Sequence, residues 1–428
     1  MSPEVISILA LVAIFLIATI LPIQMGVLAI AATFLIGIFV AGSSADDLAA
    51  GFPADLFLIL AGVTFLFAIA KNNGTVDWLV HAAVLAVRGR ISFMPWVMFL
   101  VTAALTAVGA PTFAAVAIVA PLGLGFASRH KINPVLMGLM VINGATAGGF
   151  SPISIFGGIV NTVVQRNDLP GNPMLLFVSA FVVNLLLNVL VFALFGGREL
   201  LGRRVQATDE SVEHEGVSPG SARTTTPVTS LDRHRILTLI GILGLAGGAL
   251  FFDLNVGFLA FTVAAVLSLL DPKGTKSAVS QIAWPTVLLV TGIVTYVSLM
   301  QDIGTDKYLA EQVAGIGAPL IAALLILFIG GAVSAFASTT GILGALIPLS
   351  VPIILGGGIG AVGLIIALAL SSSIVDSSPF STSGSLVVAN ADEQDRDVVF
   401  RKLMIWGMSM VVVIPIVTWI VFIAPGWL

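Results

Sequence analysis

Apolar runs long enough to cross a lipid bilayer alternate with short polar segments along almost the whole chain. In the first half this pattern predicts spans over residues 4–21, 24–41 and 53–71, an amphipathic stretch over 75–90, two apolar legs over 92–108 and 111–127, a broken span over 132–165 and a last span over 172–197. The same order returns in the second half as spans over 234–252, 255–270 and 284–301, an amphipathic stretch over 304–315, legs over 317–336 and 340–355, a broken span over 358–390 and a last span over 402–424. The chain therefore predicts an all-α polytopic membrane protein built from two repeats.

The two broken spans carry the most informative pattern, because each interrupts an apolar helix with small polar residues and a Ser-Pro pair. A shift of 227 residues superposes Ser151-Pro152 on Ser378-Pro379, Ser154 on Ser381 and Gly157 on Gly384. Unpaired backbone groups in a bilayer are tolerated only where they are buried in protein or line a cavity. Paired interruptions at corresponding places in two halves therefore predict the binding site of a transporter.

The two apolar legs of each half are short for full spans and suit re-entrant helical hairpins. Each half then crosses the membrane five times, about ten crossings in all plus two hairpins, and an odd number inverts the second half relative to the first. Only Arg166 and Lys307 of the 18 Lys and Arg residues then fall on one side. Because basic loops stay cytoplasmic, we expect a multi-pass plasma (inner) membrane protein with both termini extracytoplasmic.

One long polar stretch, over residues 198–233, is rich in Ser, Thr, Glu and Arg and predicts a cytoplasmic linker. It divides the chain into a first repeat over 1–197 and a second over 234–428. A plain tether is the simpler interpretation of this segment than a regulatory one.

Composition excludes a soluble domain, since 58% of the residues are hydrophobic, 9% are charged and the mean hydropathy is +1.12. The absence of cysteine excludes disulfides and thiolate metal sites. The chain has no Walker A loop, no HExxH motif and no base in a span beside a serine nucleophile, so an enzyme is not expected. Asp376 is the one acid deep inside a predicted span.

An anion site can be built here without a cationic side chain. A helix N-terminus offers free N–H groups and about half a positive charge. The helices that resume after the two Ser-Pro pairs and the second legs of the two hairpins would direct four such ends at the centre. The candidate substrate-binding residues are Thr112, Ser151, Pro152, Ser154, Thr339, Thr340, Ser378, Pro379 and Ser381. The alternative is that these hydroxyls only bond to backbone carbonyls or cap helix ends.

A coupling cation would sit where the first helix halves end, because helix C-termini and unwound carbonyls attract cations. Candidates there are Asn143, Thr146 and Gly148 in the first break and Ser373 and Asp376 in the second. An ionisable residue inside a membrane is a functional candidate by default. Three roles stay open for Asp376: a Na⁺ ligand or charge partner, a proton-coupling group, or a cap of the resumed helix.

These residues together resemble a known family. The Ser338-Thr339-Thr340 tip and the segment SSIVDSSPFSTSG, which ends at Gly384, are similar to those of the ion transporter superfamily. That superfamily includes the divalent anion–sodium symporters (DASS) and the MatC-type malonate/dicarboxylate carriers, which the chain resembles more closely. The resemblance covers the chain outside the linker.

The resemblance implies a homodimer in which a scaffold holds a transport domain, here residues 92–165 and 317–390, that moves like an elevator. Hairpin tips in the family contact Na⁺ and substrate carboxylates through Ser-Asn-Thr signatures. This implies such roles for Ser338, Thr339 and Thr340 in the second tip and for Thr112, which alone matches, in the first. Gly109, at the first tip, is a further candidate Na⁺ residue. The first tip otherwise departs from the signature, and better-known members do not rely on an acid at the position of Asp376.

Together these features predict a secondary active transporter of small di- or tricarboxylates with Na⁺ as the coupling ion, embedded in the lipid bilayer and without a nucleic-acid partner. An H⁺-coupled symporter or exchanger that uses Asp376 is one alternative. A passive anion channel is another, and it would need no gradient of a second ion.

Overall fold

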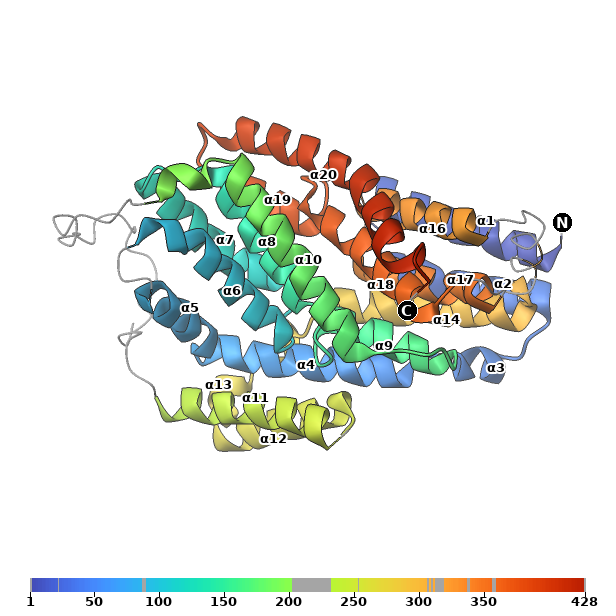
Figure 1. The fold of residues 1–428 in the computed structure, drawn as a ribbon. Helices are drawn as coiled ribbons and strands as arrows, with labels where there is room; N and C mark the ends of the chain where they lie inside the picture. The colour runs from blue at the N-terminus through green and yellow to red at the C-terminus, as the bar shows by residue number, and fades with distance from the viewer. Residues whose placement is uncertain are drawn as a thin grey trace.

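The computed structural model describes residues 2–21, 23–86, 90–201, 232–252, 254–305, 308, 311, 319–336, 339–355 and 359–426. The first half contains α1 (Pro3–Ile20), α2 (Met25–Ile36), α3 (Ala45–Ala50), α4 (Ala54–Asn72), α5 (Thr75–Ala86), α6 (Met94–Ala107), α7 (Thr112–Arg129), α8 (Pro134–Gly148), α9 (Ile155–Arg166) and α10 (Pro173–Leu194). The second half contains α11 (Arg233–Phe251), α12 (Val256–Leu270), α13 (Pro272–Thr275), α14 (Trp284–Ile303), α16 (Pro319–Ser334), α17 (Thr339–Leu355), α18 (Ala361–Ser373), the 3₁₀ turn η6 (Ile374–Ser377), α19 (Thr382–Asn390) and α20 (Arg396–Thr418). Figure 1 shows these elements as one helical assembly, which confirms the predicted fold class.

Seven of the described helices are long and apolar enough to cross a membrane by length and composition: α4, α7, α10, α11, α14, the broken helix α18–α19, and α20 with its π-helical extension. Long apolar side chains on α10 such as Leu186, Leu190 and Leu194 are exposed, which suits a lipid-facing surface. With 18 residues, α7 is long enough for a full span, so length no longer distinguishes a re-entrant leg from a crossing there. The number of crossings and the inversion of the halves stay predictions.

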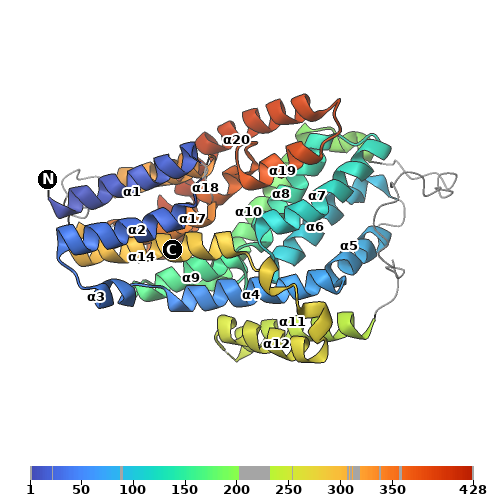
Figure 2. The same ribbon diagram turned by 180° about the vertical axis from the view of Figure 1, so that it is seen from behind.

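The first packing group consists of α1, α2, α4, α11, α12 and α14. In it, helices from one half of the chain pack on helices from the other half. Helix α4 packs along α12 and α14 packs along α2, as Figure 2 shows from behind. A Cβ added at Gly62 would lie 2.9 Å from the carbonyl oxygen of Gly257, and one at Gly292 would lie 2.2 Å from that of Gly26. Glycine is needed at both crossings because the backbones approach so closely.

The second group consists of the two pairs of hairpin legs (α6–α7 and α16–α17), the two broken helices (α8–α9 and α18–α19), α10 and α20. In it too, helices of the two halves pack on each other, since α9 of the first half packs on α17 and α19 of the second half packs on α7. Helix α10 packs on α8, and α20 packs on α16, α18 and η6. The division into a scaffold and a transport domain stays a prediction. The two groups meet where α14 contacts α17 and where α4 contacts α9.

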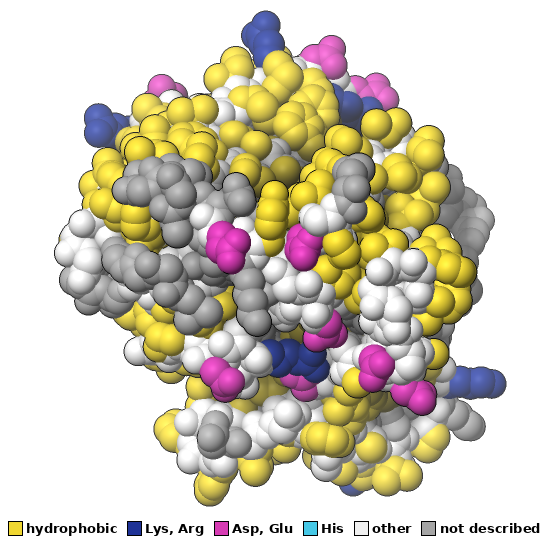
Figure 3. All heavy atoms as spheres, turned by 90° about the vertical axis from the view of Figure 1, so that its right-hand side faces the viewer, with side chains coloured by type: hydrophobic (Ala, Val, Ile, Leu, Met, Phe, Trp, Pro, Cys, Tyr) yellow, Lys and Arg dark blue, Asp and Glu magenta, His cyan; other side chains and the backbone are white. Residues whose placement is uncertain are grey.

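Several sequence predictions fall on residues outside the described ones. These are the centre of the linker at 202–231, most of the amphipathic stretch over 304–315, Lys307 and Ser338. The end of the molecule that carries the N-terminus, α3 and the last turn of α9 is seen in Figure 3, where acidic side chains predominate around the middle of the face.

Candidate functional site

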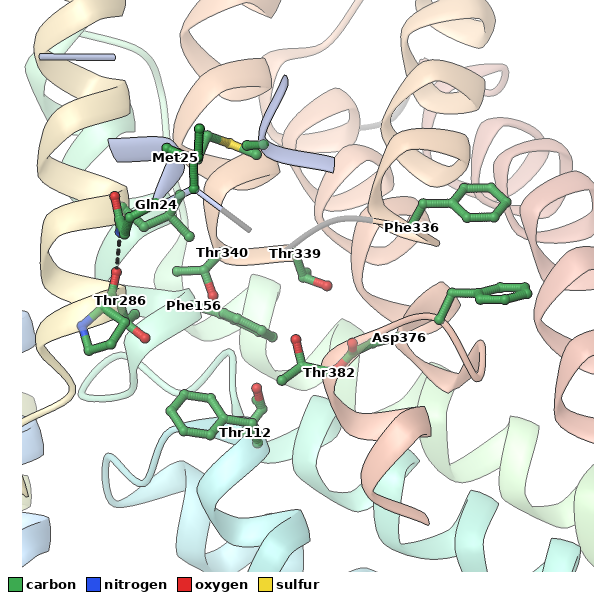
Figure 4. A pocket seen from close by; sticks show the side chains of 16 residues that line it. Gln24, Met25, Thr112, Phe156, Thr286, Phe336, Thr339, Thr340, Asp376 and Thr382 are labelled. Carbon is green, nitrogen blue, oxygen red and sulfur yellow. Dashed lines mark hydrogen bonds between the residues drawn. The ribbon is translucent and has the colours of Figure 1, made fainter. Parts of the chain in front are cut away.

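A cavity of about 510 Å³ lies at the junction of the two packing groups. It is lined by Ala18, Ile23, Gln24, Met25, Thr112, Phe113, Phe156, Pro285, Thr286, Leu289, Phe336, Thr339, Thr340, Asp376, Phe380 and Thr382. Figure 4 shows threonine hydroxyls from several helices, with Asp376, directed at this shared space. Helices far apart in the chain therefore converge on one chamber.

Most of the lining comes from the first turns of helices. Thr112 begins α7, Thr339 begins α17 and Thr382 begins α19. Phe156 lies in the first turn of α9, Thr286 in that of α14 and Met25 in that of α2. Each first turn has N–H groups without intrahelical partners and the positive end of a helix dipole. The chamber is thus surrounded by donor groups that favour a negative charge.

No described Lys, Arg or His lines this cavity. The polar side chains that do are threonines, Gln24 and Asp376. The Gln24 amide nitrogen donates to the carbonyl oxygen of Pro285 at 2.8 Å and so ties the starts of α2 and α14 together. The geometry offers an anion backbone dipoles and neutral donors in place of a fixed cationic partner.

The two breaks share one hydrogen-bond frame. The Ser154 hydroxyl donates to the carbonyls of Gly149 and Ser151 and accepts from the N–H of Gly157. Ser381 repeats all three bonds at the corresponding positions 376, 378 and 384. These two serines are N-caps of α9 and α19 and are fully buried. Their hydroxyls face the backbone and do not line the cavity.

Both Ser-Pro pairs also lie behind the cavity wall. The Ser151 hydroxyl donates to the carbonyl oxygen of Ala107 at 2.7 Å, which joins the first break to the end of α6. Ser378 is fully buried and accepts from the N–H of Phe380 at 3.3 Å. Neither serine lines the cavity, nor does Pro152 or Pro379. Of the nine candidate substrate-binding residues, the structure brings Thr112, Thr339 and Thr340 to the cavity.

Asp376 lies in the 3₁₀ turn of the second break and reaches the cavity although it is only 5% exposed. The Ser383 hydroxyl donates to its Oδ2 at 2.6 Å. Among the described residues it forms no ion pair, since the two pairs present are Arg166–Asp55 and His234–Asp271. A buried carboxylate without a cationic partner is costly, so Asp376 calls for a cation or a proton.

The other candidate Na⁺ residues have hydrogen bonds within the protein or lie at close helix contacts. Asn143 donates to the Asn188 side chain at 2.7 Å, and the Thr146 hydroxyl donates to the Ile142 carbonyl. Ser373 bonds back to the carbonyl of residue 370. Gly148 and Gly109 serve close packing, since a Cβ there would lie 1.9 Å from the Ala103 carbonyl oxygen and 2.0 Å from a Val63 methyl group. Among these candidates, Thr339 and Asp376 line the cavity.

Sequence reasoning missed the N-cap of α2 and the first turn of α14, which bring Gln24 and Thr286 to the cavity. The pairing of Gln24 with Pro285 joins positions 261 residues apart, which no local pattern predicts. It also missed Ser383. Comparing the aligned breaks residue by residue would have found it, because Asp376 and Ser383 correspond to Gly149 and Phe156.

Comparisons with known proteins agree with this architecture. Residues 1–149 match the family described as the N-terminus of the dicarboxylate carrier protein MatC, and residues 253–426 match the citrate transporter family. No curated protein matched the chain. The crystal structure of the YdaH transporter from Alcanivorax borkumensis has a similar fold, with a TM-score of 0.57 and 14% identity over 87% of this chain and 86% of that one. The first part of the chain is thus similar to MatC-type dicarboxylate carriers and the last part to citrate transporters, and the apolar helices agree with a multi-pass membrane carrier.

Proposed function

We propose that the protein is a secondary active transporter of small di- or tricarboxylates that couples their movement to Na⁺. The observation that carries the proposal is the cavity, where first turns of helices converge beside a single carboxylate and no described cationic side chain lines the wall. The substrate carboxylates bind to the N–H groups and threonine hydroxyls at the starts of α7 and α17. The matches to a dicarboxylate carrier and a citrate transporter family support this substrate class.

Coupling follows from charge. A polyanion near the buried Asp376 is repelled unless a cation occupies the space between them, so cation and anion bind cooperatively. Each must raise the affinity of the other by the same factor. In this proposal Na⁺ binds beside the second break, and the resemblance to the ion transporter superfamily supports the choice of ion.

We further propose an elevator motion in which the group containing the hairpins and broken helices slides past the group containing α4 and α14. The separation of the helices into two packing groups supports this division. The resemblance also leads us to propose a homodimer. The distribution of basic residues, which leaves only Arg166 and Lys307 on the side predicted to hold the N-terminus, supports an extracytoplasmic position for it.

A thermal-shift screen of purified protein tests the substrate class. We expect malonate, succinate, malate or citrate to raise the melting temperature, and Na⁺ at constant ionic strength to enlarge the shift, because ligands that bind the folded state stabilise it. Choline chloride is the control salt. If no carboxylate shifts the melting temperature under any salt condition, the proposed substrate class is wrong.

Proton coupling is the second candidate, and the position of Asp376 on the cavity wall without a basic partner favours it. A protonated carboxyl would remove the repulsion as Na⁺ does and could donate a hydrogen bond to the substrate. Uptake into proteoliposomes that follows a pH gradient without Na⁺ supports this candidate, and uptake that needs Na⁺ at every pH excludes it.

A further inference from the structure

We propose that the protein has one coupling-cation site with a charged ligand, in the second break alone, and that Ser383 is the residue that positions the Asp376 carboxylate there. The inference deepens the proposed function and rests on it. It assigns a positioning role to Ser383 and predicts one coupled monovalent cation, either Na⁺ or a proton, for each transport cycle.

The first step is the equality of the two backbone frames. Ser154 and Ser381 make matching bonds to the residues five and three positions before them and to the N–H three positions after. The N–H of Ile153 bonds to the Ser151 hydroxyl at 3.3 Å, just as that of Phe380 bonds to the Ser378 hydroxyl at 3.3 Å. The capping bonds of the two breaks therefore match, although residues 374–377 form the 3₁₀ turn η6 where the corresponding residues 147 and 148 still belong to α8. The chemical difference between the breaks comes from their side chains.

The second step compares the side chains at two corresponding positions of the two breaks. The second break has Asp376 and Ser383, joined by the 2.6 Å hydrogen bond, where the first break has Gly149 and Phe156. A Cβ added at Gly149 would lie 3.1 Å from a ring carbon of Phe156 and 3.3 Å from the Thr112 methyl group. The Phe156 ring and the Thr112 methyl group thus crowd the position from which a side chain at residue 149 would extend, and the first break has no charged ligand there.

The third step is the charge balance around Asp376. The elements that pack against η6 are α8, α16, α18, α19 and α20, and the first four contain no titratable side chain. Those of α20 are Arg396, Asp397, Arg401 and Lys402, which lie in its first two turns. None of them forms an ion pair with Asp376. A single negative charge left uncompensated in a buried site suits one monovalent cation.

The type of ligand points the same way. The described residues contain no group of three or more His, Cys, Asp or Glu side chains, so a transition metal lacks ligands here. Hydroxyls and backbone carbonyls beside one carboxylate are hard oxygen ligands, which can coordinate Na⁺. Ser383 is fully buried, and it joins the 3₁₀ turn to the first turn of α19. Its hydrogen bond holds the carboxylate in one orientation toward the cavity, where Figure 4 shows Asp376 beside Thr382.

The test uses full-length protein in detergent and in proteoliposomes, with Na⁺ alone as the first probe. We expect Na⁺ to raise the melting temperature of the wild type at constant ionic strength, and Asp376→Asn to lose this response. The Na⁺ dependence of carboxylate binding should have a Hill slope of one. Ser383→Ala should raise the Na⁺ concentration for half-maximal effect about tenfold at an unchanged slope, because a charge-assisted hydrogen bond is lost. Ser383→Thr should restore the wild-type value.

Phe156→Ser is the matched control, since it changes the corresponding position of the first break and should leave the slope at one. If the cation is a proton, Na⁺ has no effect, and a pH gradient drives uptake with one proton per substrate until Asp376→Asn abolishes the coupling. A slope of two, or a cation response that survives in Asp376→Asn, overturns the proposal. If Asp376→Asn does not fold, Ser383→Ala decides, and a wild-type cation response in that variant removes its positioning role. A failure of every carboxylate to bind, with the Na⁺ response intact, contradicts the proposed function alone.

Discussion

The two breaks share one set of serine-capping hydrogen bonds and differ in the side chains that these bonds position. In both, a buried serine caps the resumed helix, and a glycine three residues later lies against the carbonyl of the Ser-Pro serine. The second break adds an acid held by a serine, whereas the first has glycine and a phenyl ring at those positions. The capping bonds are thus common to both breaks, and one break carries the charge. We expect the serine-cap hydrogen bonds to be needed for folding and the Asp376 charge to be needed for coupling.

The glycines of the two frames should show the largest effect. A Cβ in Gly157→Ala would lie 2.0 Å from the Ser151 carbonyl oxygen, and one in Gly384→Ala 1.9 Å from that of Ser378. Because backbone must move in both, each variant should lose about 1–3 kcal/mol of stability and most of its transport. Melting curves in detergent measure this loss. Gly247→Ala in α11, where nothing lies within 4 Å, is the control. A large loss in one frame and none in the other would break the equality.

The hairpin threonines sharpen the comparison at the cavity. Thr112 and Thr339 begin α7 and α17 at positions 227 residues apart, and both line the cavity. We expect Thr112→Val and Thr339→Val each to weaken carboxylate binding about tenfold, because a hydroxyl that bonds to a charged ligand is lost while the shape is kept. Isothermal titration measures the affinity, and Thr262→Val, whose exposed hydroxyl bonds within α12, is the control. Unchanged affinity in both variants would move the anion away from these helix starts.

The capping serines test the frames more gently. Ser154→Ala and Ser381→Ala should each cost about 1 kcal/mol of stability, since an N-cap hydroxyl is lost from α9 or α19. The two losses should be similar, as measured by thermal unfolding. The Na⁺ response should change in Ser381→Ala only, because its hydroxyl also bonds to the backbone of Asp376. A changed Na⁺ response in Ser154→Ala would contradict the one-sided charge.

The smallest effect concerns an ion pair that the first half has and the second lacks. Arg166 at the end of α9 contacts Asp55 at the start of α4, whereas the 227-residue shift aligns Arg166 with the acidic residue Glu393. Both partners are about one-third exposed, so Asp55→Asn should cost no more than about 1 kcal/mol and less at high salt. Melting curves of Asp55→Asn and wild type at low and high ionic strength measure this loss of stability, and transport rates are compared under the same conditions. A more than tenfold loss of the transport rate would give this ion pair a role beyond holding α9 against α4.

Much of the fold could be predicted because its signals are local. The predicted broken span over 358–390 ends at the residue where α19 ends, and its Ser-Pro pair lies in the interruption. Apolar run length and Ser-Pro pairs act within a few turns, and the 227-residue shift extends each observation to the other half. The predicted homodimer, elevator motion and Na⁺ sites depend on partners and ions, and stay proposals.

The site was harder to predict because a serine or threonine hydroxyl near a helix start can either bond to the backbone or face a cavity. Ser154 and Thr112 both belong to small polar clusters near a helix start, yet one caps the backbone and the other faces the cavity. Only the rotation of each helix against its neighbours decides between them. The packing of α10 and α20 with the hairpins likewise depends on contacts distant in sequence, which hydropathy does not report.

A structure of the protein with a bound dicarboxylate and Na⁺ tests the central claim most directly. The account predicts the anion between the first turns of α7 and α17, near Asp376, with N–H groups and threonine hydroxyls around it. A dicarboxylate held by a lysine or arginine side chain, or bound away from this cavity, would contradict it.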